Sequence, residues 1–243
     1  MRQVRYRAIA DELRGRVESG ELRPGRLLPS ESELSRAHAV SRVTVRKALE
    51  LLREEGLIDA RQGFGWFVSA DPVRQVLGRL GTIEDQLVEL GLSSERRVVG
   101  FRFAAPPPRV RQVLGVEAVL EVRRVNLADG QPFARVTVWC PEEVGAGLSQ
   151  ADVERTPFYE LVGVPIGGAT QTIGAAGAGA ADADLLEIPV GSPVLRCERV
   201  TRDLEDRPLL VSEHVFPAHR TEFVVDLPRF EPSMGPSGLR LVQ

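Results

Sequence analysis

The stretch LPSESELSRAHAVSRVTVRKA, residues Leu28–Ala48, decides how the first part of the chain folds. Ser30 and Glu33 have the spacing of a capping box, which predicts that a helix starts here. Ser41 offers a second N-cap, and apolar residues follow it at helical spacing: Val45, Ala48, Leu49 and Leu52. The first two turns of this second helix also carry polar and basic residues: Arg42, Thr44, Arg46 and Lys47. Two short helices joined by a tight turn, the second one basic, are typical of a helix-turn-helix that reads DNA.

The segments on either side complete a small domain. Residues 4–19 place Ile9, Leu13 and Val17 four apart, which predicts a first helix ending near Gly20. Residues 57–68, LIDARQGFGWFV, hold two short apolar runs around a glycine-rich centre, which predicts a β-hairpin. A hairpin directly after a recognition helix is the wing of a winged helix-turn-helix, with a tip that can lie along the minor groove. The alternative is an ordinary hairpin that closes the core with Trp66 and Phe67.

The composition is that of an ordinary globular chain with room for one large domain or two modest ones. Of its 243 residues, 43% are hydrophobic and 27% are charged. No run of about 18 apolar residues predicts a membrane span, and the charged N-terminus lacks the apolar core of a signal peptide. Free thiols are favoured over a disulfide for Cys140 and Cys197, and the three histidines have no metal-ligand spacing. We therefore expect a cytoplasmic protein without a metal or other cofactor.

Charge is distributed unevenly between the two parts of the chain. Residues 1–70 hold 13 Lys and Arg against 10 Asp and Glu, which gives a net charge of +3. Residues 71–243 hold 18 against 24, which gives −6 and accounts for the total of −3. A basic excess beside the helix-turn-helix suits a phosphate-binding module, although solvated surface charge fits the same totals.

The pattern changes after residue 69. Residues 69–77 contain a proline and no clear periodicity, so we place the domain boundary there. A short amphipathic helix is predicted over residues 80–90. Segments rich in valine and aromatic residues then predict strands at residues 98–103, 120–127, 133–140, 194–201, 209–216 and 222–227. Helices are predicted at residues 110–114, 156–162 and 180–186. The spacing of the strands indicates a mostly antiparallel sheet, and therefore an α+β domain.

Residues 167–181, GGATQTIGAAGAGAA, invite comparison with a nucleotide-binding loop. Gly177 and Gly179 are followed by Asp182 at the position of the third fingerprint glycine, and no Gly-Lys-Ser/Thr follows. We therefore favour a strand of small residues that leads into a helix.

The first 70 residues resemble the winged helix-turn-helix of the GntR family of bacterial transcription regulators. The matching features occur in order: Pro24-Gly25, Leu28-Pro29-Ser30-Glu31, Glu33-Leu34, Val40-Ser41-Arg42, Thr44-Val45-Arg46, Ala48-Leu49, Leu52, Gly56-Leu57-Ile58, Gly63-Phe64-Gly65 and Phe67-Val68. The remainder is similar to the effector-binding UTRA domain of the HutC subfamily, whose fold is like that of chorismate lyase. Its weaker motifs are Arg124, Asn126 to Pro132, Phe158-Tyr159-Glu160-Leu161, Pro193-Val194-Leu195 and Asp206-Arg207-Pro208.

The resemblance implies a set of DNA contacts. Arg42 and Arg46 would be the main contacts in the major groove, because arginine can bond bidentately to guanine. Ser32 stands where some family members carry a DNA-contacting arginine, so that contact is not expected here. The full set expected on DNA is Ser30, Ser41, Arg42, Thr44, Arg46 and Lys47, with Gln62, Gly63 and Phe64 at the wing tip. Capping alone remains an alternative for Ser41, and solvated charge for Lys47.

The resemblance also implies an effector cavity. Its residues would be Thr82, Arg124, Asn126, Tyr159, Glu213 and His219. Arg135, on a neighbouring strand, could substitute for an arginine that this chain lacks. Arg124 and Asn126 are two apart, so they point to the same face of a strand. Family members that bind sugar phosphates have arginine in place of Asn126, and Glu84 adds a negative charge. We therefore expect a neutral or cationic effector, or a carboxylate held by Arg124. Salt bridges at the rim or ordinary sheet contacts are the alternative roles of these side chains.

These expectations describe a ligand-responsive transcription factor. A winged helix-turn-helix domain of residues 1–70 would be joined by a linker of residues 71–77 to a UTRA-like domain of residues 78–243. A homodimer would bind a palindromic operator, and a small metabolite would release the protein from the DNA. Its action as a repressor is carried over from the family. An enzyme of chorismate-lyase-like fold is the first alternative, although the sequence shows no nucleophile elbow or metal constellation. A constitutive DNA-binding protein with a filled cavity is the second.

Overall fold

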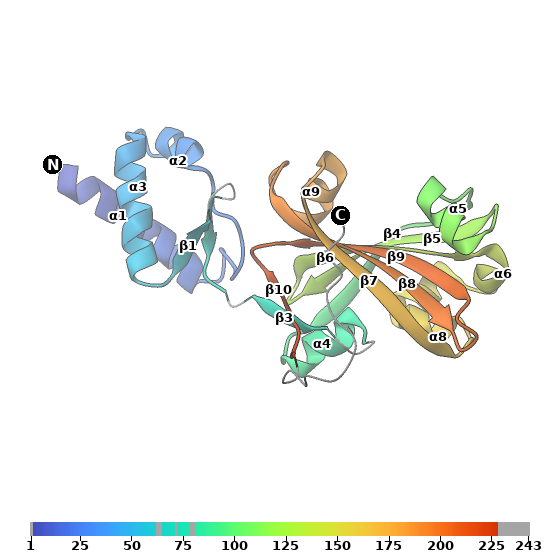
Figure 1. The fold of residues 1–243 in the computed structure, drawn as a ribbon. Coiled ribbons are helices and arrows are strands. Elements are labelled where there is room, and N and C mark those ends of the chain that lie inside the picture. Colours follow the sequence, from blue (N-terminus) through green and yellow to red (C-terminus); the bar gives the residue numbers. More distant parts are fainter. Residues whose placement is uncertain (1, 62–64, 71, 78–80, 228–243) are drawn as a thin grey trace.

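A computed structural model describes residues 2–61, 65–70, 72–77 and 81–227 of the chain. Its N-terminal domain consists of three helices and a hairpin (Figure 1): α1 Arg2–Glu18, α2 Glu31–Ala37, α3 Arg42–Glu54, β1 Ile58–Arg61 and β2 Gly65–Val68. The apolar stripes predicted from the sequence meet in one core, where Leu13, Leu49 and Leu52 are fully buried. The helix-turn-helix and the hairpin are therefore confirmed. The expected wing-tip residues, Gln62, Gly63 and Phe64, lie outside the described residues.

Local capping explains where α2 and α3 begin and end. The Ser30 N–H donates to the Glu33 carboxylate at 2.7 Å, and the Glu33 N–H donates to Ser30 Oγ at 3.2 Å. Ser41 accepts from the Thr44 N–H at 3.3 Å and so caps α3. Gly56, with a φ of 76°, follows the end of α3, where a side chain would be strained.

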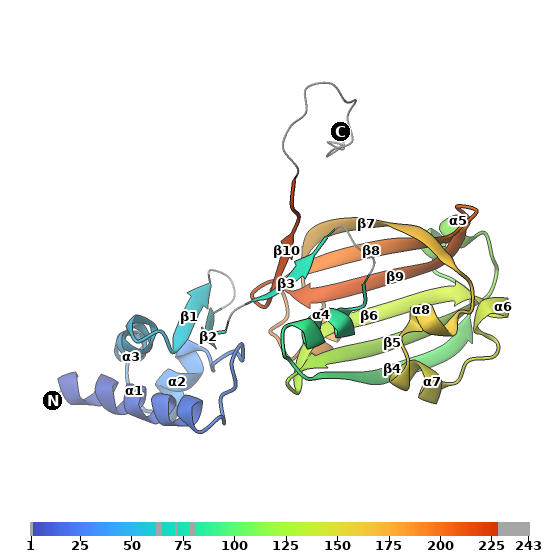
Figure 2. The same cartoon turned by 90° about the horizontal axis from the view of Figure 1, so that it is seen from below.

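The C-terminal domain is built on a six-stranded antiparallel sheet (Figure 2). The strands lie side by side in the order β4 Ser94–Ala104, β5 Val119–Ala128, β6 Gln131–Pro141, β9 Pro208–Pro217, β8 Pro193–Asp203 and β7 Ile166–Gly177. All strands predicted in this region are present, and the small-residue segment forms β7 followed by a helix. The α+β class is confirmed.

Helices cover both faces of this sheet (Figure 1). One face carries α4 Ile83–Glu89 and α8 Phe158–Leu161, with α7 Gln150–Arg155 packed near β4. The other face carries α5 Pro108–Leu114 and α9 Ala180–Leu186, while α6 Glu142–Gly145 follows β6. Because both faces are covered, the central strands are buried on both sides. The short helices α6 and α7 were not predicted from the sequence.

The segment expected to be a patternless linker, residues 71–77, contains a strand. β3 Val73–Val76 pairs in parallel with β10 Thr221–Val224, which is shorter than the predicted strand at residues 222–227. Residues 73–76 of the expected linker are thus fixed to the end of the C-terminal domain by backbone hydrogen bonds. Among the described residues, no helix is long and apolar enough to cross a membrane.

Candidate DNA-binding face and effector pocket

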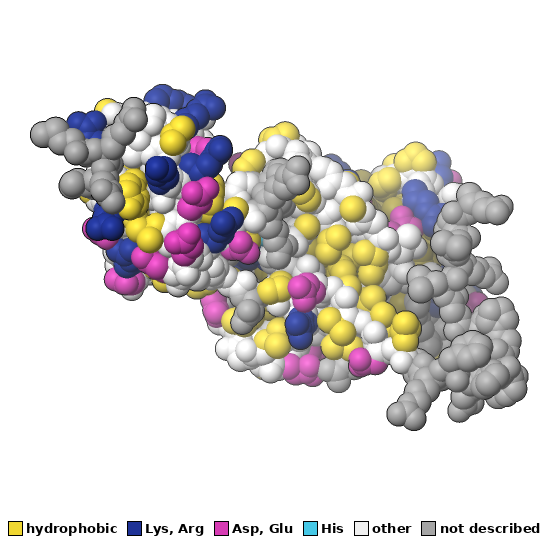
Figure 3. Space-filling model, turned by 60° about the vertical axis from the view of Figure 1, so that its left-hand side comes forward, with side chains coloured by type: hydrophobic (Ala, Val, Ile, Leu, Met, Phe, Trp, Pro, Cys, Tyr) yellow, Lys and Arg dark blue, Asp and Glu magenta, His cyan; other side chains and the backbone are white. Residues whose placement is uncertain are grey.

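The outward side of α3 carries exposed basic side chains. Arg42, Arg46 and Lys47 are exposed and Thr44 is half-buried, while Val45 and Ala48 turn inward. Figure 3 shows Lys and Arg side chains gathered more densely over the N-terminal domain than over the neighbouring part of the C-terminal domain. The expected DNA residues of α3 therefore share one accessible face, and their contact with DNA stays a prediction.

Four of the expected DNA-binding side chains already have structural partners. Ser30 Oγ caps α2, and Ser41 Oγ caps α3 and lies 2.9 Å from Thr44 Oγ1. Arg46 forms a two-point ion pair with Glu31, through Nε at 2.9 Å and Nη2 at 2.7 Å. Sequence reasoning did not anticipate this partner.

A pocket of about 430 Å³, including its open mouth, lies on the α4 and α8 face of the sheet. Its floor is formed by alternate residues of the central strands, and its rim by the start of α4 and by α8. The lining residues are Gly81, Thr82, Ile83, Arg124, Val136, Val138, Phe158, Tyr159, Arg199, Leu210, Ser212 and His214. Three expected effector residues, Thr82, Arg124 and Tyr159, are therefore brought together.

Arg124 is the most unusual group in this pocket. It is 7% exposed, and its Nε and Nη1 meet no hydrogen-bond acceptor within the described part of the chain. Its Nη2 lies 3.7 Å from Glu84 Oε1. Burial lowers the pKa of Arg124, opposed by the negative charge of Glu84, yet arginine stays protonated at neutral pH.

Glu84 belongs to a buried cluster beside the pocket. Its Oε1 accepts from Arg96 Nε at 2.6 Å and from Asn126 Nδ2 at 2.5 Å. Burial alone would raise the pKa of Glu84, but the charges of Arg124 and Arg96 outweigh burial and lower it. Asn126 is fully buried against Glu84 and does not line the pocket.

The opposite wall of the pocket contains groups that sequence reasoning missed. Arg199 donates from Nη1 to the Tyr159 hydroxyl at 3.0 Å and from Nε to Gln171 Oε1 at 2.8 Å. Ser212 Oγ lies 3.0 Å from His214 Nε2. Burial, followed by the charges of Arg199, Arg124 and Arg135, holds the pKa of His214 well below its usual value. The histidine is therefore neutral, and the pocket is positively charged through two arginines.

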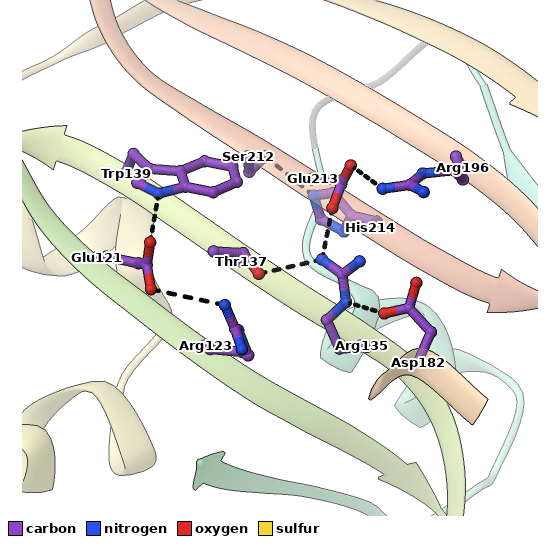
Figure 4. A network of polar contacts seen from close by, with 10 residues as sticks. All are labelled: Glu121, Arg123, Arg135, Thr137, Trp139, Asp182, Arg196, Ser212, Glu213 and His214. Atoms are coloured by element: carbon purple, nitrogen blue, oxygen red, sulfur yellow. Dashed lines mark hydrogen bonds and ion pairs between the residues drawn. The ribbon is translucent and has the colours of Figure 1, made fainter. Parts of the chain in front are cut away.

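Arg135 and Glu213 do not face this pocket, which corrects the sequence-based assignment. Each alternates with a pocket residue, Val136 or His214, so each points to the opposite face of the sheet. There Arg135 donates to Glu213 Oε1 at 2.6 Å and to Asp182 Oδ1 at 2.8 Å. Figure 4 shows these ion pairs together with Thr137 and Arg196.

The chain matches two family models, one on each domain. Residues 5–68 match bacterial regulatory proteins of the gntR family, and residues 89–222 match the UTRA domain. The chain belongs to the GntR family. It is a DNA-binding transcriptional regulator of the HutC subfamily and not an enzyme.

Relatives agree over most of the chain. It is 37% identical to the HTH-type transcriptional regulator Rv0792c of Mycobacterium tuberculosis, over 93% of this chain and 87% of that one. It is 29% identical to the HTH-type transcriptional repressor NagR of Bacillus subtilis, over 81% and 83%. The crystal structure of PhnF from Mycobacterium smegmatis superposes with a TM-score of 0.61 at 26% identity, covering 91% of this chain and 99% of that one.

His219, also expected at the effector, instead lies between the GntR and UTRA domains. It is buried, its Nε2 lies 3.1 Å from the Gly25 carbonyl oxygen, and its ring packs against Phe67 at 5.3 Å. Gly25 has a φ of 75°, and a Cβ there would come within 3.0 Å of Arg220 Nε. The Pro24-Gly25 turn therefore fits against the UTRA domain partly because it lacks a side chain.

Two further charged contacts join the GntR and UTRA domains. Arg26 forms an ion pair with Glu187, which directly follows α9. Arg23 donates from Nη1 to the Asp129 carbonyl oxygen at 3.4 Å. Arg220, beside Gly25, donates within the UTRA domain to the Pro132 carbonyl oxygen at 2.7 Å, and burial together with the charge of Arg26 lowers the pKa of Arg220 to about 10. The α9 end of the UTRA domain thus contacts the DNA-binding domain directly.

Proposed function

We propose that this GntR regulator is a cytoplasmic repressor that binds a palindromic operator as a homodimer and leaves it when a small anionic effector occupies the UTRA pocket. The observation that carries the effector part is the buried guanidinium of Arg124. It lines the pocket, and two of its nitrogens meet no acceptor among the described residues. Burying such groups without partners is costly, and a carboxylate or phosphate would supply the missing acceptors.

Of the effectors left open by the sequence, the charges around the pocket favour an anion, such as a carboxylate held by Arg124, over a neutral or cationic group. The carboxylate of Glu84 is compensated by Arg96, which lies closer to it than Arg124 does. Arg199 adds a second positive charge, and His214 adds none because it is neutral. A net positive pocket with low exposure attracts an anion more strongly than water-exposed arginines would.

The other lining groups suit a ligand that also carries hydroxyl or amine groups. The hydroxyl of Tyr159 accepts from Arg199, so its own O–H remains able to donate. Thr82 Oγ1 likewise accepts from the Asp85 N–H, and Ser212 lies beside the neutral His214. Val136, Val138 and Phe158 supply apolar walls. This mixture of apolar walls and a few convergent polar groups is usual for a metabolite site.

The DNA part of the proposal rests on the exposed face of α3 and on symmetry. We infer that α3 enters the major groove and that Arg42, Thr44, Arg46 and Lys47 supply its contacts, with residues 62–64 at the minor groove. Two copies related by a two-fold axis would read the two halves of a palindrome. The effector would change operator affinity only through the ratio of its affinities for two domain arrangements, one that binds the operator and one that does not.

A thermal-shift screen followed by DNA binding tests this proposal. Full-length protein is heated with a panel of phosphorylated sugars, sugar acids, dicarboxylates and amino acids, each beside its uncharged analogue. A hit is then titrated into a gel shift with the promoter next to the protein's own gene. We expect an anionic hit that raises the melting temperature and weakens DNA binding. A panel without any stabilising anion, combined with DNA binding that no compound alters, would favour the constitutive alternative.

A further inference from the structure

One arginine on the outward side of α3 has its direction already fixed. Arg46 contacts Glu31 along the side edge of its guanidinium, through Nε at 2.9 Å and Nη2 at 2.7 Å. A guanidinium has five N–H groups, so this contact leaves three, two on Nη1 and one on Nη2. These three form the outer end of the group. Across the described residues no hydrogen bond reaches Nη1, and the Arg46 side chain is 60% exposed.

Glu31 is itself held in place. Its Oε1 also accepts from Trp66 Nε1 at 3.3 Å, and its side chain is only 20% exposed. Trp66 lies in β2, so the carboxylate links the start of α2, the recognition helix and the wing strand. The hydrogen bond from Arg46, assisted by that from Trp66, keeps the pKa of Glu31 below its usual range despite burial. The carboxylate is therefore charged at neutral pH.

Capping does not explain the presence of Glu31. The capping box of α2 is completed by Ser30 and Glu33, which exchange two hydrogen bonds. A negative charge on a DNA-facing surface also opposes phosphate binding, because it repels the DNA backbone. Because Glu31 lowers the affinity for DNA of any sequence, we look for its role in the choice of operator sequence.

We propose that Glu31 is a positioning residue for operator recognition: it directs the outer end of Arg46 toward O6 and N7 of one guanine. Two parallel N–H groups at that end match the two acceptors of guanine in the major groove. An arginine fixed in this way does not need to be ordered when DNA binds, and it is less free to turn toward a phosphate. The inference rests on the proposed entry of α3 into the major groove.

The test uses guanine analogues in an operator recovered by the full-length protein from random-sequence DNA. Each guanine is replaced in turn by 7-deazaguanine, which lacks the N7 acceptor. The guanine whose replacement weakens wild-type binding, but not binding by Arg46→Ala, is the one that Arg46 contacts. We expect a loss of about tenfold at that guanine for the wild type.

Glu31→Gln is then compared at that guanine with Glu54→Gln, which removes the same charge at the far end of α3. We expect Glu31→Gln to reduce the tenfold loss to about twofold, while its affinity for random DNA stays equal or rises. Glu54→Gln should keep the full loss. Trp66→Phe, which keeps the ring but removes the N–H, should give an intermediate loss if its melting temperature matches the wild type.

The outcomes separate the two proposals. If Arg46→Ala binds the operator as the wild type does, the proposed role of α3 fails and the positioning role fails with it. If Arg46→Ala loses binding while Glu31→Gln keeps the full tenfold loss, only the positioning role is overturned. A parallel fall in operator binding, random-DNA binding and melting temperature in Glu31→Gln would reduce Glu31 to a structural role.

Discussion

Replacing Arg124 by methionine separates a ligand-binding arginine from a structural one. Two buried nitrogens of Arg124, Nε and Nη1, meet no acceptor among the described residues, and each buried donor left without a partner costs about 1–3 kcal/mol. Removal of Arg124 forfeits only the 3.7 Å approach to Glu84, which keeps Arg96 at 2.6 Å and Asn126 at 2.5 Å. Methionine is long and apolar enough to fill much of the vacated space. We therefore expect Arg124→Met to leave the unfolding free energy unchanged or to raise it by about 1 kcal/mol.

Arg96→Met provides the matched control, because it makes the same substitution in the same buried cluster. It removes the partner closest to Glu84 and leaves a buried carboxylate poorly compensated, at a cost of about 3 kcal/mol or more. Denaturant midpoints of the full-length variants give the comparison. About 1 kcal/mol corresponds to a melting shift of roughly 2–4 °C for a domain of this size. Equal destabilisation by both substitutions would contradict the assignment of Arg124 to ligand binding.

The same variant reports on the ligand. An anion present at ten times its dissociation constant stabilises the folded protein by about 1.4 kcal/mol. We expect the anionic hit of the thermal-shift screen to stabilise the wild type by this order and to leave Arg124→Met unaffected. Operator binding by Arg124→Met should persist without effector and should no longer respond to it. A variant that is stable and still responds to the anion would refute the proposed site.

Three further predictions concern groups outside this comparison, and a fourth concerns the domain contact. Lys47→Ala should lower the slope of operator affinity against salt by about one, because one phosphate contact is lost. The pKa of His214 is lowered in the folded protein, so the contribution of this histidine to the free energy of unfolding should be complete above about pH 6.5 and be lost as the pH falls below that value. The free energy of unfolding should then decrease by up to about 1.4 kcal/mol per pH unit. His214→Asn should reduce this slope. Burial raises the pKa of Cys140 and of Cys197 to about 12, so native protein should resist thiol reagents at pH 8. Arg26→Ala should change stability by less than about 1 kcal/mol, because the pair with Glu187 is half-exposed, but should alter the effector response.

Each of these has an outcome that contradicts it. An unchanged salt slope in Lys47→Ala would make that residue a solvated charge. A stability profile flat below pH 6.5, or one equally steep in His214→Asn, would show that this histidine is not the group responsible. Rapid modification of the folded protein would place a thiol at the surface. If Arg26→Ala responds to the effector as the wild type does, the contact between Arg26 and Glu187 has no part in the effector response.

Local signals predicted much of the fold. The caps at Ser30 and Ser41 and the stop at Gly56 require only neighbouring residues, so the sequence locates α2 and α3 closely. The strand β3 escaped prediction because Val73–Val76 has a partner, Thr221–Val224, about 150 residues away. A pattern of neighbouring residues cannot indicate a strand pairing with a segment so far away in the sequence.

The pocket was harder to predict because the sheet is buried on both faces. Along β9, Leu209, Leu210 and Val211 are all buried, so hydrophobicity does not reveal which alternate residues face the ligand. Glu213 was chosen where His214 is the residue that faces the pocket. The ion pair of Glu84 could not be predicted for a related reason. Its counter-charge comes from Arg96 on β4, and only the folded sheet brings the two together.

The contacts between the domains set the energy that an effector must supply. The described contacts are mostly polar: the half-exposed Arg26–Glu187 pair, the hydrogen bonds from Arg23 to Asp129 and between His219 and Gly25, the ring of Phe67, and Leu27 packed against the apolar cluster around α9. An exposed ion pair contributes at most about 1 kcal/mol, and a hydrogen bond about 1 kcal/mol. We therefore expect the arrangement with these contacts and a second arrangement without them to differ by only a few kcal/mol. A ligand with a differential affinity of about 100-fold, or roughly 2.7 kcal/mol, would be enough to shift their populations. A buried charge such as Arg124 supplies binding energy on that scale when its acceptors arrive, so one anion can operate the switch.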